Sequence, residues 1–222
     1  MQAVILAAGE GVRMRPLTLT KPKPLLEVAD KPLVQHAIEA LPSEVTELII
    51  VVGYLGEQIR AYCGDNFLGR TVQYVHQPEK KGTADALLLC RSYLRPGKFL
   101  VAAAPDDILD PTAWREAIKY DLCIITSTSA TPEKFGVLVL NDDGSVKKFV
   151  EKPERFISNI VNTNNMILDE RIFNYLPDRH ANGEFYLTTM VQKLALDHKV
   201  FTVAAKIWLP FATPEDLKRA GQ

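Results

Sequence analysis

The sequence contains little cysteine, and its cysteines are far apart. Cys63, Cys90 and Cys123 are the three in 222 residues, and no two of them form a CxxC pair. A disulfide framework and a cysteine-based zinc site are therefore not expected. Isolated thiols in apolar surroundings are typical of a reducing compartment, so we expect a cytoplasmic protein.

The sequence also lacks a long apolar run and a targeting signal. No stretch approaches the roughly 20 apolar residues that a membrane-spanning helix needs. No basic region precedes the first apolar segment, which begins at Gln2. We therefore expect neither a membrane partner nor a secretory signal peptide.

Neither sign of charge is in clear excess. The 26 lysines and arginines nearly balance the 27 aspartates and glutamates, which gives a formal net charge of −1. Such a chain has no overall field that would attract nucleic acid or an anionic membrane. An anionic ligand must instead be bound by a few cations that lie close together.

What the sequence does contain is an alternation of short apolar runs and helix-like segments. Runs rich in Val, Ile and Leu, as in strands buried on both faces, occur at 3–8, 48–52, 72–76, 99–104 and 122–126. Helical spacing occurs at 33–41, 56–63, 84–94 and 112–119. The alternation predicts an α/β, Rossmann-like fold with a mostly parallel central sheet and helices on both faces.

The second half has a smaller, more mixed pattern. Two apolar runs at 136–140 and 146–151 flank Asn-Asp-Asp-Gly at 141–144, which predicts a hairpin. A strand at 160–168, an amphipathic helix at 187–198 and a last strand at 200–204 are predicted to follow. Because 47% of the residues are hydrophobic, we expect the whole chain, 1–222, to form a single domain with its own core.

A glycine-rich, cationic loop follows the first predicted strand. Gly9 and Gly11 come directly after that strand, where glycine lets backbone N–H groups approach a phosphate, and Arg13, Lys21 and Lys23 follow. The dinucleotide fingerprint GxGxxG is incomplete, because Met14 stands at its third glycine, and the P-loop motif is absent. The loop suits a triphosphate; the alternative is an ordinary glycine turn with solvated charges.

At this point the sequence resembles a known family. The motifs LAAGEGVRMRPLT at 6–18, KPKPLL at 21–26 and KPL at 31–33 are similar to the signature of the sugar-phosphate nucleotidyltransferases, and the resemblance continues to PEDL at 214–217. It departs at Val12, where the family usually has threonine or another small polar residue. The resemblance implies the nucleotide-diphospho-sugar transferase fold and the joining of an NTP to a sugar 1-phosphate.

The resemblance divides the chain and implies its first site residues. Residues 1–110 would mainly bind the nucleotide, and residues 111–222, which hold the mixed portion, mainly the sugar phosphate. The nucleotide would lie against Ala7, Ala8, Gly9 and Gly11. Arg13 and Lys23 would be the catalytic cations, Arg13 on the leaving pyrophosphate and Lys23 at the point of attack. Phosphoryl-type transfer does depend mainly on positioning and on neutralising negative charge.

A second set of residues is implied for the base. Gln77, Gly82 and Thr83 match the family's nucleotide-binding glutamine and its Gly-Thr-Ala element. An amide side chain can both donate and accept hydrogen bonds, which suits the edge of a base. The pattern favours UTP or dTTP. The alternative is a polar loop in which Thr83 caps a helix, and the two roles are compatible.

The metal site that the resemblance implies is incomplete. Asp106 follows an apolar strand and matches the family's Mg²⁺ ligand, although Pro105 replaces the glycine before it. Mg²⁺ takes hard oxygen ligands, typically one or two carboxylates plus substrate phosphates. The second acidic ligand of the family is replaced by Pro210, which has no side-chain oxygen. Mg²⁺ is therefore the expected cofactor, with activity reduced by the change at Pro210.

The hairpin of the second half is implied to bind the sugar phosphate. Gly136 matches a glycine on the family's sugar side, and Glu151 and Lys152 match its Glu-Lys-Pro motif. In the family the Glu binds sugar hydroxyls and the Lys binds the phosphate. Neighbours on a strand normally face opposite sides, so we expect Pro153 to end the strand and let both reach the ligand. The alternative is an exposed hairpin end.

A later strand is implied to complete the sugar site. Asn162 and Thr163 match an Asn-Thr-Gly element whose asparagine contacts the sugar, and Asn164 replaces its glycine. Asparagine tolerates positive φ better than most residues, so the turn is expected to survive. The segment 183–188 resembles a sugar-side helix start, with a purely structural role as the equal alternative.

The sequence is consistent with two functions. The first is an active nucleotidyltransferase whose partners are an NTP and a sugar 1-phosphate, and the intact cationic and acidic set favours it. The second is a catalytically weak regulatory homologue that binds a nucleotide or sugar nucleotide, which the changes at Pro105, Asn164 and Pro210 favour. The sequence leaves homo-oligomerisation open.

Overall fold

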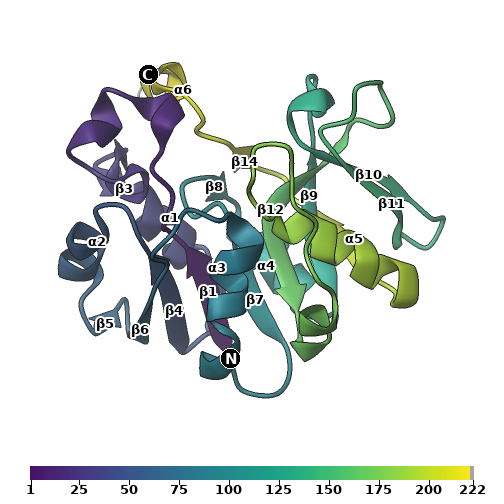
Figure 1. The fold of residues 1–222 in the computed structure, drawn as a ribbon, viewed down its shortest axis with the longest axis horizontal. Helices are drawn as coiled ribbons and strands as arrows, with labels where there is room; N and C mark the ends of the chain where they lie inside the picture. The colour runs from purple at the N-terminus through teal and green to yellow at the C-terminus, as the bar shows by residue number, and fades with distance from the viewer. Residues whose placement is uncertain (221–222) are drawn as a thin grey trace.

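A single large sheet organises the protein in the computed structural model, which describes residues 1–220 (Figure 1). Its main strand order is β11-β10-β12-β7-β1-β4-β6-β5, with β9 beside β12 and β13 beside β9. The strands are β1 Gln2–Leu6, β4 Glu47–Val52, β5 Asn66–Phe67, β6 Arg70–His76, β7 Phe99–Ala102, β9 Cys123–Thr128, β10 Gly136–Leu140, β11 Val146–Glu151, β12 Ile160–Leu168 and β13 Phe201–Ala204.

The first half of the chain builds the parallel part of this sheet. β1 pairs with both β4 and β7, and β4 pairs with β6, all in parallel. Every residue of β1 and of β7 is buried, as expected for Val-, Ile- and Leu-rich strands covered on both faces. The chain moves from β1 outward to β4 and β6, and then returns to the opposite side at β7. The strand order therefore reverses between β1 and β7.

The second half extends the sheet with antiparallel pairs. β10 and β11 form the predicted hairpin, and β12 runs antiparallel to β7, β9 and β10. One edge of β12 pairs with β10 at Val161 and with β7 from Asn165 onward. The register of β12 against β9 shifts between Asn162 and Asn165, so a bulge lies between the two pairings. This mixed portion continues the parallel sheet without a break.

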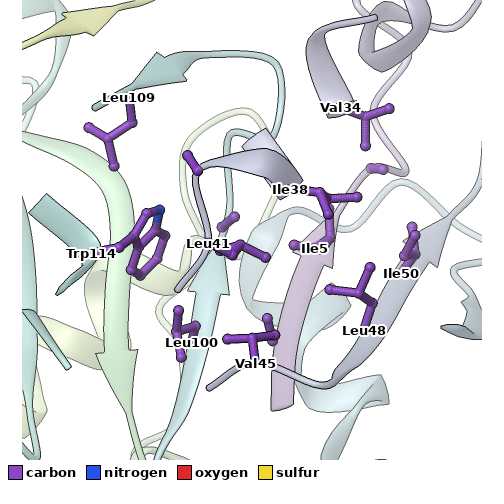
Figure 2. Packing of buried hydrophobic residues seen from close by; sticks show 14 of the residues in the cluster. Ile5, Val34, Ile38, Leu41, Val45, Leu48, Ile50, Leu100, Leu109 and Trp114 are labelled. Atoms are coloured by element: carbon purple, nitrogen blue, oxygen red, sulfur yellow. The ribbon is translucent and has the colours of Figure 1, made fainter. Parts of the chain in front are cut away.

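Helices cover both faces of the sheet, as predicted. One core cluster packs α1 (Leu33–Glu39), α2 (Gly56–Cys63) and α4 (Pro111–Ala117) on the face that contains Ile5 (Figure 2). The other packs α3 (Thr83–Leu89) and α5 (Leu187–Asp197) on the face that contains Val4, in front of the sheet in Figure 1. None of the helices within residues 1–220 has the length and apolar character that crossing a membrane requires.

Small elements complete the fold near the carboxyl ends of the strands. β2 (Glu27–Val28) pairs with β3 (Lys31–Pro32), and β8 (Ile108–Leu109) pairs with β14 (Trp208–Leu209). The helix α6 (Pro214–Ala220) follows β14. The pairing of β8 with β14 brings the end of the described chain back to the loop after β7.

The predicted helix at 84–94 was too long. α3 ends at Leu89, and a separate 3-10 turn covers Arg91–Tyr93. The backbone tightens to bonds between residues three apart, since the Cys90 N–H donates to the Leu87 carbonyl and the Tyr93 N–H to the Cys90 carbonyl. Apolar periodicity alone does not separate these two kinds of turn.

A substitution at Ile5, in the central strand β1, tests how much the core contributes to stability. It is fully buried between α1 and the sheet (Figure 2). We expect Ile5→Ala to lower the free energy of unfolding by about 2–5 kcal/mol, since it removes buried methyl groups and leaves a cavity. Urea unfolding measures this loss. Leu196→Ala on the solvent face of α5, where the side chain is 83% exposed, is the control and should change stability little.

Candidate active site

A cavity of about 420 Å³ lies where the strand order reverses. It is lined by the loops that follow β1, β6 and β7, together with residues before α5. Open α/β sheets bind ligands in the crevice beyond the carboxyl ends of the strands at such a reversal. The volume falls within the range of small-molecule sites.

The cavity brings together the whole predicted nucleotide set. The predicted residues that line it are Ala7, Ala8, Gly9, Gly11, Arg13, Lys23, Gln77, Gly82, Thr83 and Asp106. The predicted sugar-side residues are not among those that line it; they are Gly136, Glu151, Lys152, Asn162 and Thr163. The nucleotide half of the prediction is thus gathered at one place, and the sugar half lies beside it.

Gly11 lets the glycine-rich loop close over Lys23. Its φ is +61°, and an added Cβ would lie 2.9 Å from the Cβ of Lys23. The Thr18 hydroxyl donates to the Gly11 carbonyl at 2.8 Å, which also fixes the loop. A side chain at position 11 would be strained and would also push Lys23 away. The loop geometry and the position of Lys23 are therefore set together.

Lys23 is a buried cation that points into the cavity. Its ammonium forms an ion pair with Asp106, and both side chains are 15% exposed. Burial lowers the pKa of Lys23 to about 8, while the carboxylate of Asp107 favours the charged form and Arg13 opposes it. Lys23 and Arg13 are thus two neighbouring positive groups on one wall of the cavity, as a polyphosphate requires.

Asp107, next to Asp106 in the chain, anchors the segment 208–211 beside the cavity. One carboxylate oxygen accepts from the Trp208 indole N–H at 3.0 Å, and the other accepts from the Phe211 backbone N–H at 3.2 Å. Burial raises the pKa of Asp107 to about 6, against the opposing effects of Lys23 and of these two donors. Both carboxylate oxygens of Asp107 already accept hydrogen bonds from the protein. Asp107 therefore has a structural role and is not a free metal ligand.

The cavity offers few side-chain oxygen ligands for a metal ion. Among residues 1–220, no group of three or more His, Cys, Asp or Glu side chains is placed to hold a metal ion. Asp106 is one carboxylate facing the cavity, paired with Lys23, and Pro210 supplies no side-chain oxygen. One carboxylate holds Mg²⁺ when substrate phosphates complete the coordination. The residues therefore fit a metal that is bound together with a phosphate substrate.

The loop at 77–83, named the base loop after its predicted role, is bound tightly to the segment before α5. Gly82 has a φ of +95°, and a Cβ there would clash with the Phe185 carbonyl. The Phe185 N–H donates to the Lys81 carbonyl at 2.7 Å, and the Ala84 N–H donates to the Phe185 carbonyl at 3.0 Å. Thr83 accepts from the Leu187 N–H at 3.0 Å. Thr83 therefore caps α5, a helix 104 residues later, and does not cap its own helix.

The charged ends of Glu151 and Lys152 lie close together at the end of the hairpin. β11 ends at Glu151, and Lys152 has a φ of +43°. This left-handed residue breaks the alternation of the strand, so the two side chains come within 4.0 Å of each other. The Lys152 ammonium lies 5.6 Å from the centre of the Tyr186 ring, and Tyr186 lines the cavity. The turn begins one residue before the predicted Pro153.

The bulge in β12 engages both polar groups of Asn162. Asn164 has a φ of +61°, so the turn expected from the substitution does form. The Asn162 carboxamide accepts from the Asn164 N–H at 2.8 Å and donates to the Asn164 side chain at 3.0 Å. Thr163 is fully buried, and its hydroxyl donates to the Ile125 carbonyl at 2.8 Å. Asn162 and Thr163 thus stabilise the bulge in this structure.

The cavity also contains residues that the sequence patterns did not single out for its wall. Glu10 lies 3.7 Å from Lys80 and 3.6 Å from Arg15, so it joins the phosphate loop to the base loop. Glu184 and Tyr186 reach the cavity from the segment before α5. For that segment the resemblance leaves a structural role and a sugar contact as equal alternatives.

A comparison with known proteins identifies the family. The sequence profile described as nucleotidyl transferase matches residues 2–221. The chain belongs to the nucleotidyl transferase family. The chain is 32% identical to the bifunctional protein GlmU of Methanococcus maripaludis, over 99% of its own length and 53% of that protein. It is also 32% identical to the UTP–glucose-1-phosphate uridylyltransferase AglF of Haloferax volcanii, over 100% of its length and 96% of that protein.

Solved structures share the fold of this chain. A UDP-glucose pyrophosphorylase complexed with UDP-glucose superposes with a TM-score of 0.88 and 23% identity, covering 99% of this chain and 96% of the other. At that identity the match establishes the fold, which agrees with the predicted nucleotide-diphospho-sugar transferase architecture. The chain spans about half the length of the bifunctional relatives that it matches.

Gly82 and Gly97 form a matched pair for testing the base loop. Both have positive φ, but a Cβ at Gly97 would meet open space, whereas one at Gly82 would clash with Phe185. We expect Gly97→Ala to cost about 1–3 kcal/mol from backbone strain alone, and Gly82→Ala to cost more. Urea unfolding of both variants measures the difference. Equal losses would show that the contact with Phe185 does not constrain the loop.

Proposed function

We propose that the protein joins an NTP, with UTP or dTTP favoured, to a sugar 1-phosphate, giving an NDP-sugar and pyrophosphate. The observation that carries this proposal is the pair of cations, Arg13 and Lys23, beside a glycine-rich loop in a cavity at the strand reversal. Residues 1–110 mainly bind the nucleotide and residues 111–222 mainly bind the sugar phosphate. The free, buried cysteines agree with a cytoplasmic protein.

The proposed reaction needs no covalent enzyme intermediate. A phosphate oxygen of the sugar 1-phosphate attacks the α-phosphorus of the NTP, and a new P–O bond forms there. The bond between the α-phosphorus and its bridging oxygen breaks, and pyrophosphate leaves with that electron pair. The attacking phosphate is already anionic, so a general base is not required. The protein must align the two phosphates and offset their charge.

Arg13 and Lys23 supply that charge in the proposal. Arg13 binds the departing pyrophosphate, and Lys23 binds at the α-phosphate. Lys23 is paired with Asp106 before substrate binds, so a phosphate competes with Asp106 for the ammonium. Asp106 would then hold Mg²⁺ together with the phosphates, where the ion supplies further neutralisation of their charge. The carboxylate of Asp107 favours the charged form of Lys23.

The sugar phosphate is proposed to lie between the hairpin and Tyr186. Lys152 is half-exposed and lies over the Tyr186 ring, so its ammonium can reach a phosphate near the cavity. Glu151 is a neighbouring acceptor for sugar hydroxyls. Asn162 would have to exchange its bonds to Asn164 for bonds to the sugar. We therefore place more of the sugar recognition on Glu151 and Lys152 than on Asn162.

The second candidate function is a nucleotide-binding regulatory homologue with little turnover. Three observations favour it: Asp106 is neutralised by Lys23, position 210 is a proline, and Asn162 is bonded within the chain. None of them removes the cationic wall of the cavity. This candidate therefore shares the nucleotide-binding site with the first and differs from it in catalysis.

A substrate panel separates the two candidates. Each NTP is combined with a set of sugar 1-phosphates and Mg²⁺, and pyrophosphate release and thermal shift are measured in parallel. Release with a preferred pair supports the enzyme. A thermal shift with nucleotide but no release with any pair supports the binding homologue, and neither signal would reject both.

Arg13 tests the phosphate loop. Arg13→Ala should lower kcat by a factor on the order of 10²–10³, since it removes one positive donor to the developing charge. Arg15→Ala is the matched control, because Arg15 is on the same loop but pairs with Glu10 and is not among the cavity-lining residues. Steady-state pyrophosphate release measures both. Near-normal activity of Arg13→Ala would reject the assignment.

Lys152 tests the sugar side. Lys152→Ala should raise the KM for the sugar 1-phosphate by about tenfold or more and leave the KM for the NTP nearly unchanged, because one charge-assisted bond is lost on one substrate. Lys148→Ala on the exposed part of β11 should change neither constant. Equal increases in both KM values for Lys152→Ala would argue against separate nucleotide and sugar sides.

A further inference from the structure

The side chain of Gln77 is held by two acceptors. Its Nε2 donates to the Gly82 carbonyl at 3.1 Å and to Asp85 Oδ2 at 2.8 Å. A flipped carboxamide would place Oε1 against a carbonyl and a carboxylate, which are both acceptors, so the orientation is determined by chemistry. The Gln77 N–H donates to the Val52 carbonyl at 2.9 Å, which anchors the backbone. Gln77 is thus fixed at both ends.

This arrangement uses both N–H bonds of the carboxamide. A glutamine amide has two donors and one oxygen acceptor. Among residues 1–220, Oε1 accepts no hydrogen bond, although Gln77 is 9% exposed and lines the cavity. Gln77 therefore presents an acceptor to a ligand and has no donor left. Asp85 is outside the cavity wall and acts on the ligand only through Gln77.

We propose that Asp85 is a positioning residue that makes Gln77 select bases with a ring N–H. Uracil, thymine and guanine carry a ring N–H on the Watson–Crick edge, which can donate to Oε1. Adenine and cytosine carry an unprotonated ring nitrogen at the corresponding place, which would face Oε1 with two acceptors opposed. An unpaired buried acceptor costs binding energy, so the site disfavours those bases. This inference rests on the proposed function.

Asp85 can impose this polarity because its bond to Gln77 is charge-assisted. A carboxylate accepts more strongly than a carbonyl and cannot donate. The distance from Gln77 Nε2 to Asp85 Oδ2 is 2.8 Å, whereas the distance from Nε2 to the Gly82 carbonyl oxygen is 3.1 Å. Without Asp85, the carboxamide keeps one weaker partner and can turn its N–H toward the ligand. Selection then depends on an acid that does not contact the base.

The test compares UTP, CTP and N3-methyl-UTP, which keeps the uracil carbonyls but lacks the ring N–H. In the native protein we expect kcat/KM for UTP to exceed that for the other two by about a hundredfold. Asp85→Ala should reduce these ratios by about tenfold or more. Asp85→Asn, which retains an acceptor oxygen, should largely preserve them. Glu79→Ala, at an exposed position in the same loop, is the control.

The ratio of kcat/KM for UTP to that for each other nucleotide distinguishes a positioning role of Asp85 from a general folding defect. A folding defect would lower kcat/KM for all three nucleotides by the same factor, and unchanged ratios in Asp85→Ala would overturn the inference. Equal use of UTP and N3-methyl-UTP by the native protein would also overturn it, with the proposed function intact. If no NTP releases pyrophosphate, calorimetric binding of UDP, CDP and N3-methyl-UDP makes the same comparison. No nucleotide binding at all would reject both proposals.

Discussion

The burial of one positive charge organises the site. Lys23 lies inside the protein near Arg13, Asp106 and Asp107, and burial lowers its pKa to about 8 because desolvation disfavours the charged form. Asp106 and Asp107 offset this unfavourable burial of charge, and Asp107 is held in place by other contacts. Asp107 binds Trp208 and Phe211, so neutralising Lys23 also draws in the segment that follows β13.

The segment that contains Trp208 also contacts the residues next to the β10–β11 hairpin. The Trp208 ring packs edge-on against Phe135 at 5.2 Å between ring centres, and the Phe135 carbonyl accepts from the Lys152 N–H at 3.0 Å. A chain of direct contacts therefore runs from the phosphate loop to the hairpin. The two halves of the sheet are therefore linked through Asp106 and Asp107 and the residues that these two contact.

Local patterns predicted much of the fold, and together with the family resemblance they named residues that line the cavity. Strands such as 48–52 are short, apolar and flanked by turns, so their residues determine their conformation directly. The residues after β1 and β6 could be located because they follow those strands in sequence. The contacts of Thr83 with Leu187, and the placing of β12 beside β7, depend on chain pairings 60 or more residues apart. Neither periodicity nor spacing contains that information, and the left-handed turn at Lys152 had no signal of its own.

The position of β12 also has a consequence for how the chain reaches this structure. β7 pairs with β1 on one edge and with β12 on the other, yet β12 follows in sequence only after β9, β10 and β11. Until Asn165 to Leu168 arrive, the parallel sheet has an unpaired edge at β7, which is a template for association with other chains. Closing so long a loop is slow compared with local helix formation. Refolding should therefore be limited by the docking of β12, and the species before it is the one exposed to aggregation.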